Sequence, residues 1–282
     1  MKIEIKKQTV NFKPEPQEKT SLVFSNTFEK YMLAISRFRL KFKSDHHVRR
    51  IGVNLAANAV INEALSYTAG LTLFDTSDNF LDEGAIDVCA VACVGVDDPE
   101  LMLLANQTPG EANPRYKSRK ISVPGINSFE LTYENNKDHH VKVISADTYL
   151  KDTSTDGKIS MSAEMWDASN NHAIADNMSH CYLGYEGSSK KLWTKPFKLK
   201  NDETMEVEHK KKQCGIMISG FYVSYSDGKD HHLKEIEVGA KLEASGNNCR
   251  VVGCLTLDDS SSHYKKDSSY VKGFVFGYDD SL

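Results

Sequence analysis

The tripeptide Asp-His-His occurs three times in this chain, at nearly equal intervals. It begins at Asp45, Asp138 and Asp230, so the intervals are 93 and 92 residues. Each copy ends a segment of similar pattern: ISRFRLKFKSDHH, INSFELTYENNKDHH and ISGFYVSYSDGKDHH. A fixed period of this length is typical of a protein built from repeated structural units. The sequence therefore predicts three homologous modules of about 92 residues.

Further landmarks recur in the same order after each tripeptide. An aspartate followed two residues later by serine lies 30, 29 and 29 residues after the first Asp of the tripeptide, at Asp75, Asp167 and Asp259. Each copy then closes with a glycine, a valine or tyrosine, and an acidic residue. These landmarks predict domain boundaries that give repeats at 1–98, 99–188 and 189–282.

The segment before each tripeptide alternates apolar and polar residues, at 38–42, 129–133 and 221–225. A period of two predicts a β-strand with one buried face. A second strand is expected to begin at the histidine pair, where the step of three from Val48 to Ile51 indicates an irregularity such as a bulge. Only 98–105 has an apolar spacing that suggests a short helix.

Five or six strands in each copy predict an all-β protein of three tandem β-sandwich-like repeats. Two arrangements of the repeats are compatible with the sequence. The copies form beads on a string, or they pack around an internal pseudo-threefold axis.

Charge and hydropathy exclude some classes of protein. The chain has 35 basic and 39 acidic side chains and a net charge of −4, whereas nucleic-acid-binding proteins usually carry a basic excess. No apolar stretch approaches the roughly 20 residues of a membrane span, and the first twelve residues lack the apolar run of a signal peptide. We therefore expect a soluble protein that is cytoplasmic as synthesised, or released without a classical signal peptide.

The six cysteines do not recur at equivalent positions of the three copies, and no Cys-x-x-Cys pair occurs. A disulfide framework repeated with the fold and a zinc ribbon are therefore both disfavoured. Free buried thiols are expected.

The Asp-His-His tripeptides are the candidate binding residues. Successive side chains of a strand point to opposite faces, so the first and third residues of each tripeptide share a face. These pairs are the predicted ligand-binding residues: Asp45 with His47, Asp138 with His140, and Asp230 with His232. The middle residues His46, His139 and His231 are assigned as metal ligands, because equivalent histidines around an axis can meet at one ion. No cofactor is required by the sequence, and a divalent metal is the one that these residues suggest.

A structural interpretation explains the same residues. An aspartate after a hairpin turn can accept hydrogen bonds from nearby backbone amides, and a histidine can pair with it. The recurring Asp-x-Ser landmarks likewise resemble Asx turns. The tripeptides would then be duplicated determinants of the fold.

Three functions are compatible with these features. The first is a non-catalytic, lectin-like recognition protein that binds glycans or a cell surface through three related sites. The second is a structural subunit of a fibre, phage-like tail or toxin complex that docks on a threefold-symmetric partner. The third is a metal-dependent enzyme using His and Asp, although the chain has no Gly-x-Ser-x-Gly elbow, phosphate loop or His-Glu-x-x-His motif.

Overall fold

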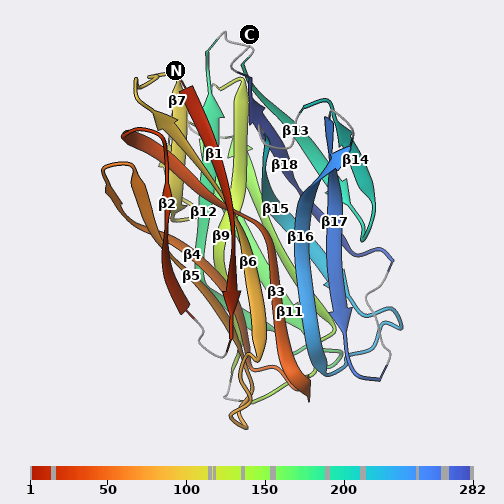
Figure 1. The fold of residues 1–282 in the computed structure, drawn as a ribbon. Coiled ribbons are helices and arrows are strands. Elements are labelled where there is room, and N and C mark those ends of the chain that lie inside the picture. The colour runs from red at the N-terminus through yellow and green to blue at the C-terminus, as the bar shows by residue number, and fades with distance from the viewer. Residues whose placement is uncertain are drawn as a thin grey trace.

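The computed structural model describes residues 2–13, 17–113, 116, 119–134, 137–152, 157–187, 191–209, 214–245, 248–261 and 267–279. Within these ranges the protein is all-β, with eighteen strands and no α-helix (Figure 1). The strands form three six-stranded sheets in which all neighbours are antiparallel. The prediction of an all-β protein is confirmed.

Within each sheet the strands are hydrogen-bonded in the following order. Sheet I contains β1 (Lys2–Phe12), β6 (Glu83–Val94), β3 (Phe28–His46), β16 (Leu233–Ser245), β17 (Asn248–Asp258) and β14 (Thr204–Val207). Sheet II contains β2 (Gln17–Val23), β5 (Ala64–Phe74), β4 (Arg50–Ile61), β9 (Ile121–Tyr133), β12 (Ala173–Tyr185) and β7 (Leu101–Gln107). Sheet III contains β13 (Leu192–Leu199), β18 (Tyr270–Tyr278), β15 (Cys214–Ser224), β10 (Val143–Asp152), β11 (Gly157–Trp166) and β8 (Ala112–Asn113).

Every sheet combines strands from two of the predicted segments. The boundaries at residues 98 and 188 fall between β6 and β7 and between β12 and β13, so each segment contributes six strands. Read from one edge, each sheet contains the first, sixth and third strands of one segment and then the fourth, fifth and second strands of another. Sheet II shows this order when it is read from β7 to β2. The junctions are β3 with β16, β9 with β4, and β15 with β10. This interleaving is incompatible with separate modules arranged as beads on a string.

The three sheets enclose a common apolar core. Phe38 of β3, Phe129 of β9 and Phe221 of β15 are buried, and their ring centroids lie 5.6 to 5.9 Å apart in edge-on or tilted geometry. These residues belong to the alternating segments before the tripeptides, which explains why one face of each strand is apolar. Aromatic contacts of this geometry stabilise a core beyond the burial of area alone.

Residues 101–107 form a β-strand, so the suggestion of a helix at 98–105 was wrong. Leu101 and Leu103 pack in one buried cluster, whereas Met102 packs in another with Tyr116 and Tyr182. Both faces of β7 are therefore apolar near its start. A short continuous apolar run has no period that separates a buried strand from a helix.

The irregularity expected between Val48 and Ile51 lies at Arg49, where the chain bends before β4 begins. The bend lets both Val48 and Ile51 be fully buried although they are three residues apart. The chain also changes partners at this bend. Val48 bridges to His139, and Ile51 pairs with Leu131 of β9.

The six cysteines are buried and none is in a disulfide, as the sequence predicts. Among the described residues no helix is long and apolar enough to cross a membrane.

Candidate metal centre

The three Asp-His-His tripeptides meet at one end of the molecule. Figure 1 shows both chain termini at the opposite end from the tip of β3, which ends at His46. Backbone pairing joins the residue after one tripeptide to the middle histidine of another. The pairs are Val48 with His139, Val141 with His231, and Leu233 with His46. The tripeptides are thus linked in a ring, although they are about 92 residues apart in sequence.

The third residues of the tripeptides, His47, His140 and His232, lie together inside this ring. Their ring centroids are 4.5, 4.5 and 4.6 Å apart. Each offers one ring nitrogen, and these three nitrogens lie within 4.8 Å of one another. Among the described residues this is the one group of three or more His, Cys, Asp or Glu with the spacing to hold a metal ion. We call it the trihistidine cluster.

The electrostatics of the cluster favour the neutral imidazole at His47 and at His140. Partial burial lowers the pKa of His47, and its neighbours His140 and His232 lower it further. The pKa of His140 is also lowered, first by burial and then by the charge of the nearby His232. A neutral imidazole has a free lone pair, and this is the form that ligates a metal.

The first residues of the tripeptides hold turns of neighbouring segments. The carboxylate of Asp45 accepts a hydrogen bond from the amide of Ser260 at 2.6 Å. Asp138 accepts from the amide of Thr76 at 2.7 Å and also from its hydroxyl. The sequence suggests nearby amides as the partners of these carboxylates, whereas the structure provides distant ones.

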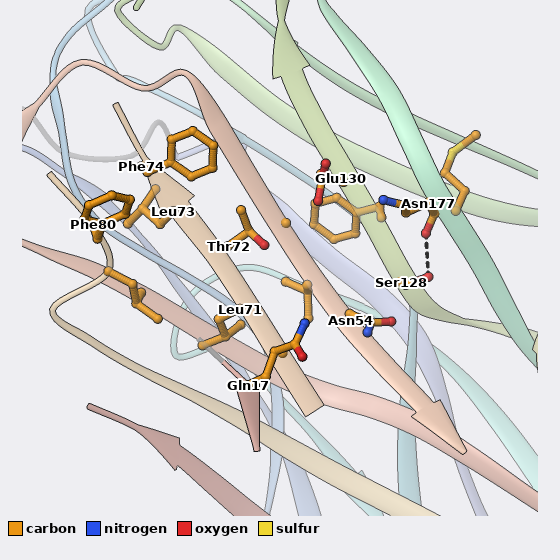
Figure 2. A pocket seen from close by; sticks show the side chains of 16 residues that line it. Gln17, Asn54, Leu71, Thr72, Leu73, Phe74, Phe80, Ser128, Glu130 and Asn177 are labelled. Carbon is orange, nitrogen blue, oxygen red and sulfur yellow. Dashed lines mark hydrogen bonds between the residues drawn. The ribbon is translucent and has the colours of Figure 1, made fainter. Parts of the chain in front are cut away.

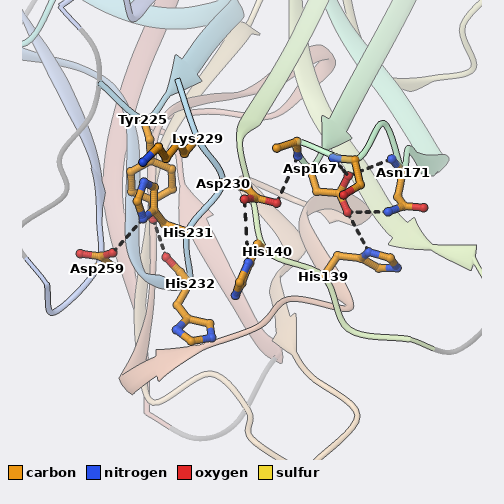
Figure 3. Close-up of polar contacts among 12 residues, drawn as sticks. His139, His140, Asp167, Asn171, Tyr225, Lys229, Asp230, His231, His232 and Asp259 are labelled. Carbon is orange, nitrogen blue, oxygen red and sulfur yellow. Dashed lines mark hydrogen bonds and ion pairs between the residues drawn. The ribbon is translucent and has the colours of Figure 1, made fainter. Parts of the chain in front are cut away.

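Asp230 shows how such a carboxylate reaches the cluster (Figure 3). It accepts a hydrogen bond from the amide of Ala168 at 3.2 Å. Its Oδ1 also lies 3.9 Å from Nδ1 of His140, so an ion pair forms when that imidazole is protonated. Closer approach of this carboxylate, to hydrogen-bond distance, would orient the imidazole and leave its other nitrogen for a ligand.

The middle histidines are not part of the cluster, because the imidazole of each lies beside a different aspartate. Nδ1 of His46 lies 3.4 Å from Asp75, that of His139 lies 2.9 Å from Asp167, and that of His231 lies 3.5 Å from Asp259. Their rings also pack against aromatic residues four or six positions earlier in the chain, namely Phe42, Tyr133 and Tyr225. The assignment of the middle histidines as metal ligands stays a prediction, and the structure brings a different set together.

The carboxylates that contact the middle histidines organise Asx turns, as predicted. Oδ1 of Asp75 accepts from the amides of Ser77 and Asn79 at 2.8 and 2.9 Å. Asp167 makes the same two bonds to Ser169 and Asn171, and Asp259 accepts from the amide of Ser261 at 2.8 Å. Burial alone would raise the pKa of Asp75 and Asp167, but these hydrogen bonds outweigh it and hold both below their usual value.

Each predicted Asp-x-His pair is therefore divided between two roles. The aspartates join the segments and the third residues converge, so the six residues surround one site where three separate sites were expected. No residue-level signal distinguishes the second histidine from the first. The distinction follows from pairing between segments, which the repeat alone does not specify.

No protein-family model matches this chain, and no curated protein is significantly similar to it in sequence. The geometry of the cluster is therefore the guide to its chemistry. Three imidazoles at one open end match the three-ligand sites in which a zinc ion keeps its fourth position for water or another donor.

Proposed function

We propose that this chain is a metal-binding protein that holds one divalent transition-metal ion, such as Zn²⁺, on His47, His140 and His232. The observation that carries the proposal is the convergence of their three ring nitrogens within 4.8 Å. A zinc ion bound at about 2.0–2.1 Å to each nitrogen needs them about 3.4 Å apart, so the rings move inward slightly on binding. Rotation of partly exposed side chains accomplishes this without moving the buried strands.

The segments at 1–98, 99–188 and 189–282 are, in this proposal, repeats around a pseudo-threefold axis that passes through the metal. The equal strand order of the three sheets supports it. The phenyl cluster of Phe38, Phe129 and Phe221 supports it further, because those residues occupy equivalent places in the three segments. One ion on the axis then binds all three segments at once.

The role proposed for the metal is recognition without catalysis. Three protein ligands leave a coordination position that a donor from a partner can fill. This proposal retains the recognition role expected from sequence and replaces three binding sites by one. The convergence of His47, His140 and His232 in one group supports a single site in place of three.

A second proposal follows from the same axis. A chain with internal threefold pseudosymmetry presents matching surfaces to a threefold partner, so docking on a fibre, tail or toxin assembly is the alternative function. The strand order that favours the axis favours this proposal too. It predicts a complex of the chain with a symmetric partner, and a chain that purifies alone from its source would contradict it.

Calorimetric titration of the chelator-treated protein with Zn²⁺ tests the metal proposal. We expect one ion per chain, with binding weakened at least about a hundredfold in the variant His140→Ala because one of three ligands is lost. The control is His172→Ala, which removes an imidazole stacked on Trp166 outside the cluster. His139→Ala distinguishes the two sets of histidines, since it should leave one ion bound. Unchanged zinc binding by a folded His140→Ala protein would refute the proposal.

A further inference from the structure

The outer face of sheet II contains a hollow that the metal proposal does not use. It has a volume of about 760 Å³, within the range of small-molecule sites in proteins. Its floor is the outer face of β5, β4 and β9, where Gly52 lies between Thr72 and Glu130 (Figure 2). Asn54 lies beside it, between Gly70 and Ser128. Gly52 and Gly70 belong to neighbouring cross-strand pairs, so two positions on this face carry no side chain.

The same place is filled in the other two sheets. The residue that follows Ile51 is Gly52, whereas those that follow Ile144 and Ile236 are Ser145 and Glu237. In sheet I, Glu237 accepts a hydrogen bond from Arg37 at 2.8 Å, and the neighbouring Arg39 binds Glu235. In sheet III, Ser145 pairs with Tyr222, whose ring stacks on Tyr270. The absence of a side chain at Gly52 therefore contributes to the hollow in sheet II.

Two phenyl rings form one end of the hollow. Phe74 ends β5, and Phe80 lies across from it with a centroid distance of 6.1 Å. Phe80 is 59% exposed. Arg50 lies over the ring of Phe74 at 5.1 Å and holds that ring against the sheet. These rings provide an apolar wall that stays open to solvent.

Side-chain amides supply the polar rim. Gln17, Asn54 and Asn177 line the hollow, and among the described residues no hydrogen bond occupies their side-chain amides. Asn177 is held there by a break in the register of β12 and has a positive φ of 50°, a conformation uncommon outside glycine. Its carbonyl accepts from the hydroxyl of Ser128, which fixes the backbone and leaves the side chain free (Figure 2).

The charge of the site is balanced. Glu130 lies 3.4 Å from Arg50, which also donates to Thr132. Among its described lining residues, the hollow thus offers no unpaired charge to a charged ligand. It offers amide groups that each donate and accept, which suits hydroxyl groups.

We propose that this hollow binds the ring of a neutral saccharide. A pyranose ring presents an apolar C–H face to Phe74 and Phe80 and its hydroxyls to the amides of Asn54, Gln17 and Asn177. The proposal keeps the glycan expected as a partner and assigns it to residues that the sequence did not single out. It is independent of the metal at the axis, because no residue that lines the hollow belongs to the trihistidine cluster.

The test uses the full chain labelled with ¹⁵N and a panel of D-galactose, D-glucose, D-mannose, N-acetylglucosamine and N-acetylgalactosamine. All titrations contain a chelator, so that loss of a metal-dependent effect cannot be confused with loss of this one. We expect at least one sugar to shift the amide signals of Gly52 and Gly70 in a saturable way. Gly239 and Gly253 of sheet I are the internal controls and should not shift.

The variants Phe80→Ala and Asn54→Ala should each raise the dissociation constant for that sugar by about fivefold or more. The matched control is Tyr149→Ala, which removes another exposed aromatic ring, 49% exposed on β10 of sheet III, and should leave binding unchanged. All three positions are exposed, so folding should be unaffected. A panel in which no sugar moves the signals of the hollow, or binding that is equal in wild type and Phe80→Ala, would overturn the proposal.

Discussion

The end of the molecule where the three tripeptides meet and the outer face of sheet II show opposite uses of the three segments. We call the first the axial end, after the proposed axis. At the axial end the same kind of contact is made three times, by side chains from all three segments. On the outer faces the equivalent positions hold glycine, serine and glutamate, and the hollow lies on the sheet that has glycine. Contacts that join the segments limit change at all three places together, whereas an outer face can change in one sheet alone.

The core beneath the axial end should show the largest effect of a single substitution. Phe129→Ala removes a fully buried ring that contacts Phe38 and Phe221, so we expect the free energy of unfolding to fall by about 3–5 kcal/mol. Phe80→Ala in the hollow should change it by less than about 0.5 kcal/mol, because that ring is exposed. Urea unfolding measures both. Equal losses would show that the two regions do not differ as described.

A buried histidine of sheet II should make the stability of the fold sensitive to acid. His180 of β12 is buried, and burial lowers its pKa to about 4. The unfolded chain takes up this proton at about pH 6.5, so stability is fully present above that pH and is lost as the pH falls toward 4. We expect a loss of about 3 kcal/mol over this interval and a flatter profile in His180→Leu. The free energy of unfolding in urea is measured at each pH for both proteins. Parallel pH profiles of wild type and His180→Leu would contradict this assignment.

The Asx turns that support the axial end should contribute a moderate amount. Asp167→Ala removes the acceptor for the amides of Ser169 and Asn171 and the partner of His139, all in a buried place. We expect a loss of about 2 kcal/mol in the free energy of unfolding. Asp176→Ala, at an exposed position of β12, is the control and should have little effect. If thermal unfolding does not separate these variants, the turn does not support the site.

The pH dependence of zinc binding should be the smallest effect. Three ordinary histidines would weaken binding about eightfold on lowering the pH to 6.5, a factor of about two for each. His47 and His140 have lowered pKa values and are protonated only at lower pH, so we expect a smaller loss. Calorimetric affinities at about pH 8.5, where an ordinary histidine is neutral, and at pH 6.5 decide the point. A loss of eightfold or more would mean that the cluster does not depress these pKa values.

Much of the local structure could be predicted from the sequence. The alternation before each tripeptide gives the buried faces of β3, β9 and β15, since a period of two needs no tertiary information. The Asx turns at Asp75, Asp167 and Asp259 likewise depend on residues two to four positions apart. The strand β7 was missed because its apolar run carries no period.

The sites could be predicted only in part. The tripeptides identified the end of the molecule that contains the candidate site, but which histidine of each pair converges depends on pairing such as that of Val48 with His139. The hollow was not predicted at all. The missing side chain of Gly52 contributes to it, and a glycine within a strand does not reveal which face lies open.

The most direct test of the central proposal is a crystal structure of the protein grown with Zn²⁺, with anomalous scattering recorded at the zinc absorption edge. We predict one strong peak at the axial end, bonded at about 2.0–2.1 Å to one nitrogen each of His47, His140 and His232. A well-ordered cluster without a peak, or separate peaks on His46, His139 and His231 with their own carboxylates, would contradict the account.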